Sequence, residues 1–384
     1  MKLYKYLMVI IMPLSITAQT AFYNHGAIQI HDNASIAFHT NLVNDGNFDD
    51  NNKGLVTFYS DTEILTVSGN NKAIFFDVDI DTANDLELQT SLGITNDLSF
   101  INGKILTPRD NLNTSLDFIN HNIYAGEDNL RHVDGYTSIN GLNEFTFPIG
   151  DDNQLRPMIL PTQSTKSTFL GAYFSEDPNT PNTFGQSFLT DQKQVFIENI
   201  SKKEFWDLNG TNATSITLTW NAQSDIPLIT DAIDRLKVVG WSITENKWID
   251  LGNANVIGDL NSGRITSNTF IPDNFEIITI ASGFSDNNSV DTNILFSPNG
   301  DNINDTLIFE NLESYDNNNL EIFNRWGNVV YKTENYKNNW SGESTGRFTL
   351  NTKDKLPTGT YFYILNYVKN GTSKVQKGWV YINL

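Results

Sequence analysis

Residues 74–81 of the 384-residue chain read Ile74-Phe75-Phe76-Asp77-Val78-Asp79-Ile80-Asp81. Apolar residues recur at every second position, and successive side chains of a strand point to opposite faces, so this stretch predicts a β-strand with one buried face. The expected inward side chains are Ile74, Phe76, Val78 and Ile80. Asp77, Asp79 and Asp81 share the other face about 6.5 to 7 Å apart, where carboxylates repel each other unless water or a cation lies between them. The three aspartates are therefore either a solvated edge or a candidate calcium site.

Similar apolar groups return between residues 21 and 131, separated by polar turns such as Asn44-Asp45-Gly46 and Ser68-Gly69-Asn70. Two or three groups fill each ~20 to 25 residues, a rhythm typical of a short β-solenoid in which stacked coils complete the core. The sequence thus predicts a β-solenoid-like region over residues 19–135. A β-sandwich built from the same strands is the alternative, because both architectures alternate apolar and polar residues.

The rhythm changes after residue 135. Residues 136–199 read as a β-rich connecting region, interrupted by a long loop at 175–185. Residues 200–282 hold six or seven alternating strands, which predict an immunoglobulin-like β-sandwich. Four of the seven tryptophans lie in this segment, and we expect them to fill its core: Trp206, Trp220, Trp241 and Trp248. Residues 283–291 are polar and predict a linker.

The first eighteen residues have the pattern of a secretory signal peptide. Lys2 and Lys5 precede a short apolar run, and small residues end it at Ala18. The run is too short to span a bilayer as a helix, so we expect no transmembrane segment after signal removal. The chain contains no cysteine, so an exported product must be stabilised by core burial, sheet hydrogen bonds or bound ions instead of disulfides.

The charge of the chain is strongly acidic and unevenly distributed. The formal net charge is −20, and residues 19–291 hold 14 basic against 36 acidic side chains. Residues 292–384 hold nine of each and are close to neutral. An acidic surface repels nucleic-acid phosphates and anionic lipid, which argues against both as partners.

Residues 292–384 carry three ordered motifs. Residues 296–301 read Phe296-Ser297-Pro298-Asn299-Gly300-Asp301, residues 322–327 read Ile322-Phe323-Asn324-Arg325-Trp326-Gly327, and residues 356–361 read Leu356-Pro357-Thr358-Gly359-Thr360-Tyr361. This quarter of the chain resembles the gliding-motility-associated C-terminal domain, or type B sorting domain, of proteins exported by the type IX secretion system of Bacteroidota. The resemblance implies delivery to the cell surface or the medium by way of the periplasm. It also implies two partners, the outer-membrane translocon and an associated outer-membrane protein.

The sorting domain itself predicts another immunoglobulin-like sandwich. Asn370-Gly371 between two apolar runs is a hairpin signal. In the last run Val380, Ile382 and Leu384 face one way, whereas Trp379 and Tyr381 face the other. Either this strand is central in its sheet, or one of its faces meets the export machinery.

A second candidate calcium site lies at the start of the sorting domain. Oxygen-bearing side chains surround Gly300 in a short loop, at Asn299, Asp301, Asn304 and Asp305. Calcium prefers such oxygen ligands. Capping and turn hydrogen bonds made by Asn and Asp explain the same residues without a metal.

The sequence holds no motif for nucleophilic catalysis or nucleotide binding, and no pair of its five histidines has metal-ligand spacing. We therefore expect no catalytic residue, no cofactor other than calcium, and no enzyme activity. Two function classes remain. The favoured one is a non-catalytic, adhesin-like protein of the cell surface or the medium. The alternative is a carbohydrate-active enzyme, a polysaccharide lyase or glycosidase, because short solenoids and sandwiches host such sites.

Overall fold

The structure is a computed structural model that describes residues 21–48, 51–120, 123–194, 197–283, 294–301, 303–309, 312, 316–345, 355–369 and 372–384. The expected signal peptide, most of the expected linker 283–291 and the pair Asn370-Gly371 lie outside these residues. The fold is all β, as the sequence predicts, with four sheets and a few short 3₁₀ turns.

Contacts divide the chain into two compact units. The first holds the described residues up to 193 together with 199–282, and the second holds those from 283 onward with a short piece around residue 197. The division after Ser282 coincides with the start of the expected linker. The expected boundaries at 135/136 and 199/200 lie inside the first unit.

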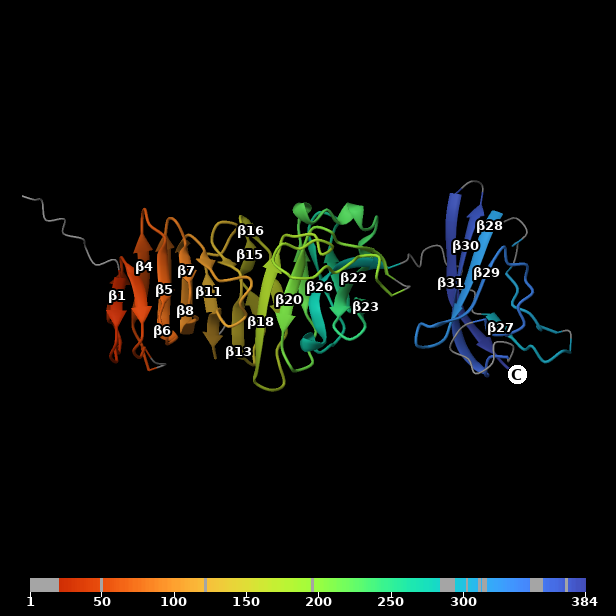
Figure 1. Cartoon of the computed structure of the whole chain (residues 1–384), viewed down its shortest axis with the longest axis horizontal. Coiled ribbons are helices and arrows are strands. Elements are labelled where there is room, and N and C mark those ends of the chain that lie inside the picture. The colour runs from red at the N-terminus through yellow and green to blue at the C-terminus, as the bar shows by residue number, and fades with distance from the viewer. Residues whose placement is uncertain are drawn as a thin grey trace, which may run out of the picture. The chain divides into compact units, whose positions relative to one another are not determined.

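The first unit begins as a two-sheet solenoid of parallel coils (Figure 1). Each coil contributes one short strand to each sheet, so register partners are residues of successive coils: Leu55 pairs with Asp77, and Asp77 with Asp97. One sheet has the order β1 (Ala21–Asn24), β3 (Asn41–Asn44), β5 (Leu65–Ser68), β7 (Leu86–Leu88), β9 (Ile105–Leu106), β12 (Val133–Asp134) and β15 (Ile149–Asp151). The other has the order β2 (Ser35–Phe38), β4 (Leu55–Ser60), β6 (Ala73–Thr82), β8 (Leu92–Asn102), β10 (Leu116–Ile119) and β13 (Thr137–Gly141), with β11 (Ile123–Ala125) also paired to β8.

Both sheets then change from parallel to antiparallel pairing. In the first sheet β15 pairs antiparallel with β16 (Gln154–Leu155). In the second, β13 pairs antiparallel with β18 (Ser167–Phe174). That sheet continues without a break through β20 (Phe205–Asn209), β26 (Phe275–Gly283), β22 (Leu236–Ser242) and β23 (Lys247–Gly252), and β19 (Ile197–Ile200) also belongs to it. We call the region of this change the junction.

Beyond the junction a five-stranded antiparallel sheet shares its core with the continuing large sheet. Its order is β14 (Phe145–Phe147), β17 (Met158–Leu160), β21 (Thr217–Trp220), β25 (Gly263–Thr266) and β24 (Asn255–Gly258). Four 3₁₀ turns connect the strands: η1 (Ala222–Ser224), η2 (Ile226–Leu228), η3 (Ile233–Arg235) and η4 (Pro272–Asn274). The prediction that tryptophans fill this region is confirmed, since Trp206, Trp220, Trp241 and Trp248 are all buried.

One hydrophobic core runs through the whole first unit, from Ile30 in the first coils to Ile280 in β26. The predicted inward positions are only half correct in β6. Val78 and Ile80 are buried, but the register against β8 shifts between Phe75 and Asp77, and this bulge turns Ala73 and Phe75 inward in place of Ile74 and Phe76. Asp77, Asp79 and Asp81 face outward as expected, each only partly exposed.

Buried asparagines tie successive coils together. Asn24 donates its amide to Asn44 Oδ1 at 2.8 Å, and Asn44 in turn donates to the Asn71 carbonyl at 3.0 Å. Asn52 accepts from the Ile30 backbone at 2.7 Å and donates to the Ile74 carbonyl at 2.7 Å. Each amide satisfies backbone groups that the sheets leave over at the coil corners, so these asparagines crosslink the coils in a chain without disulfides.

The second unit is one five-stranded sheet with its own core. The order is β27 (Ile294–Phe296), β31 (Thr372–Ile382), β30 (Gly359–Lys369), β28 (Asp316–Phe323) and β29 (Val329–Glu334). The predicted antiparallel hairpin is confirmed, since β30 and β31 pair from Gly359 with Ile382 to Lys369 with Thr372. The last strand, β31, lies inside the sheet between β27 and β30, with Val380 and Ile382 buried. Leu384 lies beyond the strand and is exposed, contrary to expectation.

Candidate functional site

The aspartates of β6 lie on the outer face of the solenoid. Asp77 Oδ1 accepts a hydrogen bond from the Asn96 amide at 2.7 Å, and β8 places Asp97 directly beside Asp77. Partial burial raises the pKa of Asp79, a hydrogen bond from Ser99 opposes this, and the neighbouring aspartates add to the rise. The outer face of β6 therefore carries a row of carboxylates that repel one another. Calcium at Asp77, Asp79 and Asp81 stays a prediction.

The loop around Gly300 is held by its own side chains. Asn299 Oδ1 accepts from the Asp301 backbone at 3.0 Å, Asp301 Oδ1 accepts from Ile303 at 2.8 Å, and Asp305 Oδ1 accepts from Gly300 at 2.7 Å. Asn304 has a positive φ of 54°. These turn hydrogen bonds use one oxygen of each of three candidate ligands. Calcium at Asn299, Asp301, Asn304 and Asp305 also stays a prediction.

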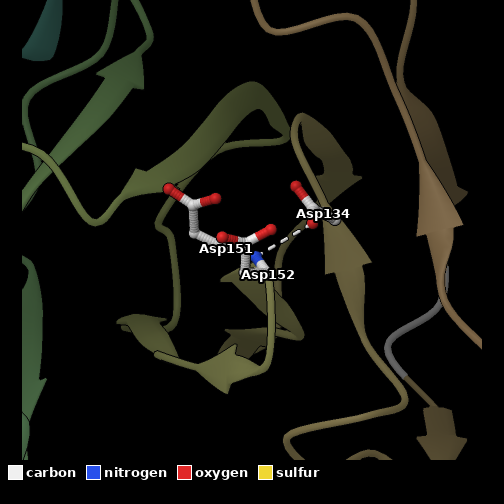
Figure 2. A group of neighbouring side chains, drawn as sticks. All are labelled: Asp134, Asp151 and Asp152. Atoms are coloured by element: carbon white, nitrogen blue, oxygen red, sulfur yellow. Dashed lines mark hydrogen bonds between the residues drawn. The ribbon is translucent and has the colours of Figure 1, made fainter. Parts of the chain in front are cut away.

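A third acidic group, which the sequence did not single out, lies at the junction. Figure 2 shows Asp134 at the end of β12 opposite Asp151 and Asp152 at the end of β15. Their carboxylate oxygens lie within 4.8 Å of one another. The Asp152 backbone donates to Asp134 Oδ2 at 3.0 Å, the contact drawn as a dashed line.

Two basic side chains form ion pairs with these carboxylates. The Arg109 guanidinium lies 2.5 Å from Asp134 Oδ1 and 3.1 Å from Asp151 Oδ1, and Lys104 Nζ lies 3.5 Å from Asp134 Oδ2. Arg109 also donates to the carbonyls of Tyr173 and Gly150 at 2.7 and 2.9 Å. Because two cations face three carboxylates, the group is an ion-pair network that joins the last coil to the antiparallel strands, and it carries no metal assignment.

A more deeply buried ion pair lies nearby. Arg156, between β16 and β17, places Nε 3.0 Å from Glu204 Oε2, and both side chains are only 2% exposed. The Tyr173 hydroxyl donates to the same carboxylate at 2.7 Å, and Arg156 Nη2 donates to Asn221 at 2.9 Å. Burial raises the pKa of Tyr173 well above its usual value, and the Glu204 charge adds to this, so its proton stays on the hydroxyl. With Tyr173 of β18, the pair joins the residue after β16 to the residue before β20.

The junction also carries a cavity of about 420 Å³ whose lining mixes carboxylates with apolar rings. Asp207 of β20 lies in its wall, and its carboxylate accepts from the Tyr136 hydroxyl at 2.7 Å and from Asn209 at 2.8 Å. Burial raises the pKa of Asp207 to about 7, against the effect of the Tyr136 hydrogen bond and with a contribution from Glu276. Perturbed carboxyls in a cavity mark candidate functional sites.

The raised pKa of Asp207 predicts a pH-dependent stability. The folded chain holds this proton more tightly than the unfolded chain, so the contribution of the group is fully present below about pH 4 and is lost as the pH rises to about 7. Between pH 4 and pH 7 we expect wild type to lose about 3 kcal/mol relative to Asp207→Asn. Urea unfolding of both at pH 4 and pH 7 measures the difference, with Asp110→Asn, an exposed carboxylate of the same cavity, as control. Identical pH dependence of wild type and Asp207→Asn would show that the carboxyl is not perturbed.

The three C-terminal motifs meet in the second unit. Phe296, Ile322 and Tyr361, one from each motif, belong to the same core, and Trp340 packs its ring 5.4 Å from Phe296. The middle motif is the turn between β28 and β29, which leaves Trp326 70% exposed. A family model described as CHU_C Type IX secretion signal domain matches residues 290–382, the same segment. Residues 290–382 are a type IX secretion signal domain.

A type IX secretion signal implies export to the cell surface or outside the cell, and with it contact with the secretion machinery. No curated protein and no solved structure matches the chain. Within the residues that the structure describes, no helix is long and apolar enough to cross a membrane.

Sequence reasoning missed the residues of the junction. The sequence does not single out Arg109, because its partners Asp134 and Asp151 come from later strands. No local signal marks Arg156, because it follows the polar run Asp151-Asp152-Asn153-Gln154 and its partner Glu204 is far away in the sequence. The sequence identifies Trp326 as a motif residue but does not predict that its side chain is exposed.

Proposed function

We propose that the chain is a non-catalytic, adhesin-like protein in which the solenoid and sandwich of residues 21–282 are a rigid binding passenger, exported by its sorting domain. The observation that carries the proposal is the single core that runs from Ile30 to Ile280. A continuous stack without internal boundaries suits presentation of an outer surface, and stacked repeats offer extended binding faces.

The charges of the passenger support the same assignment. Arg109 and Arg156, both at the junction, are held in ion pairs within the fold, so neither is a ready base for a lyase. The outer face of the solenoid carries the acidic row Asp77, Asp79 and Asp81, which suits a cationic or calcium-bridged ligand.

A glycan and protein array probed with the mature full-length chain tests the proposal. We expect saturable binding to a restricted set of glycans or proteins through the passenger. If the binding depends on calcium, loss of this dependence in Asp79→Asn would assign the metal to the β6 aspartates. Loss of the dependence in Asp301→Asn would assign it to the Gly300 loop. Binding to no array component, together with turnover of a polysaccharide, would contradict the proposal.

One observation favours the second candidate function, a glycosidase. Glycoside hydrolysis uses two carboxyls whose environments separate their pKa values, and the cavity holds Asp207, with its raised pKa, together with Glu276. This candidate predicts release of reducing sugar ends by the wild-type chain and at least a hundred-fold loss of that release in Asp207→Asn. The adhesin-like proposal expects no such release from either chain.

A further inference from the structure

Trp326 is the most exposed large apolar side chain among the described residues of the sorting domain. It is 70% exposed, whereas Trp340 in the same domain is 2% exposed. Tryptophan is seldom left open to water on a monomer surface, because it is the largest side chain and its burial is strongly favourable. Packing of the domain's own core therefore does not explain why residue 326 is a tryptophan.

The turn that carries Trp326 is fixed by its backbone and by one asparagine. Asn324 and Asn328 close the hairpin at 2.9 Å, and Gly327 donates to the Asn324 carbonyl at 2.9 Å with a positive φ of 78°. Asn324 Oδ1 accepts from the backbones of Trp326 and Asn328, both at 3.0 Å. This is the three-residue hairpin loop in which glycine takes the left-handed position. None of these bonds uses the indole, so the turn would form with a small polar residue at 326.

Arg325 completes the exposed surface of the turn. Its guanidinium carbon lies 4.3 Å from the centre of the Trp326 ring, a cation–π distance. Tryptophan and arginine are the residues most enriched among binding hot spots, and a pre-formed loop loses little entropy on binding. The turn has the composition and the rigidity of a recognition element.

Three aromatic residues lie next to one another across the sheet beside the turn. Phe323 ends β28 and pairs with Phe362, which pairs in turn with Trp379. Ile322 and Tyr363, the neighbours of the first pair, are buried in the core, so this row points to the opposite face. Phe362 is 38% exposed. Phe323, the member nearest the turn, is fully buried, so the exposed apolar surface at the turn is that of Trp326 itself.

We propose that Trp326 and Arg325 form the contact by which the sorting domain docks on a protein of the outer-membrane type IX secretion machinery. This inference rests on export by the sorting domain, whose family match includes the turn. A protein partner is expected, because a type IX secretion signal implies contact with the secretion machinery.

Export of full-length variants in a type IX-competent bacterium tests the inference. We expect Trp326→Ala to lower the exported fraction at least ten-fold, with accumulation in the periplasm, and Trp326→Phe to retain part of it. Leu295→Ala and Ile303→Ala, which truncate side chains that are each 66% exposed in the same domain, are matched controls and should export normally. Thermal unfolding of the purified full chains should be unchanged in all four, because none of these side chains is buried.

Binding of the purified full chain to outer membranes identifies the partner. Wild type should bind membranes from a strain with the translocon and not from a strain without it, and Trp326→Ala should bind about thirty-fold more weakly. Equal binding to protein-free vesicles of the same lipids would overturn the protein partner. Normal export of Trp326→Ala, while a chain lacking residues 292–384 stays inside, would overturn this inference alone. If the chain lacking those residues is also exported, the export account itself fails.

Discussion

A chain that ends at Val290 remains in the periplasm. The truncation removes the sorting domain and leaves the first unit whole, because contacts divide the molecule after Ser282 and each unit has its own core. The passenger should therefore fold, pass the inner membrane and then stop for lack of an export signal. Immunoblots of periplasm, outer surface and medium measure the distribution, and we expect the exported fraction to fall to the background of a periplasmic marker. Degradation of the truncated chain is the alternative cause of its absence outside, so its recovery in the periplasm is the necessary control.

Replacement of Arg156 by methionine strongly destabilises the passenger. The substitution leaves the Glu204 carboxylate buried, 2% exposed, without its cation, and loss of one partner from a buried pair costs about 3 to 5 kcal/mol. It also removes the bond from Arg156 to Asn221. Urea unfolding of the full chain at pH 7, followed by the fluorescence of the buried tryptophans, should show a fall of that size in the first unit's unfolding free energy.

Two further variants serve as controls, one at an exposed ion pair elsewhere and one that removes both charges of the buried pair. Arg131→Met breaks the pair between Arg131 and Asp128, which are 37% and 46% exposed, and should cost less than about 1 kcal/mol. The double variant Arg156→Met with Glu204→Leu removes both charges and should recover most of the loss, because an apolar pair of similar volume substitutes well for a buried ion pair. Equal losses in Arg131→Met and Arg156→Met would mean that Arg156 is not buried with its partner.

Local sequence patterns were sufficient to predict the strands and the all-β class. Val78 and Ile80 alternate with aspartates as a one-sided strand requires, and the structure buries both. The same pattern failed two residues earlier, because the bulge after Phe75 depends on how β6 pairs with β8 and leaves no mark in the local alternation. The alternation of apolar and polar residues predicts the buried face of a strand only where its pairing with the neighbouring strand keeps a regular register.

The change from parallel to antiparallel pairing could not be predicted for a related reason. It is decided where β13 meets β18, between residues such as Thr137 and Gly171 that are far apart in the chain. The segment from 200 onward therefore resembles a separate sandwich in sequence, although four of its strands, β20, β26, β22 and β23, continue the solenoid's sheet.

The candidate sites likewise divide into those that the sequence predicts and those that only the fold brings together. The Gly300 loop and the β6 aspartates were visible because their members are near neighbours in sequence. The Asp207 cavity and the ion pair of Arg156 with Glu204 were not, because each joins side chains from separate strands, as in the bond from Tyr136 to Asp207. Burial, which gives these groups their significance, is a property of the finished fold.

The most direct measurement joins residues 284–384 to a foreign protein that carries a signal peptide and normally stays in the periplasm. If the sorting domain is a self-contained export signal, the fusion reaches the surface or the medium in a bacterium with a working translocon, and it stays inside when the translocon is deleted. Retention of the folded fusion in the periplasm of the translocon-bearing strain would contradict the account, because export would then depend on the passenger.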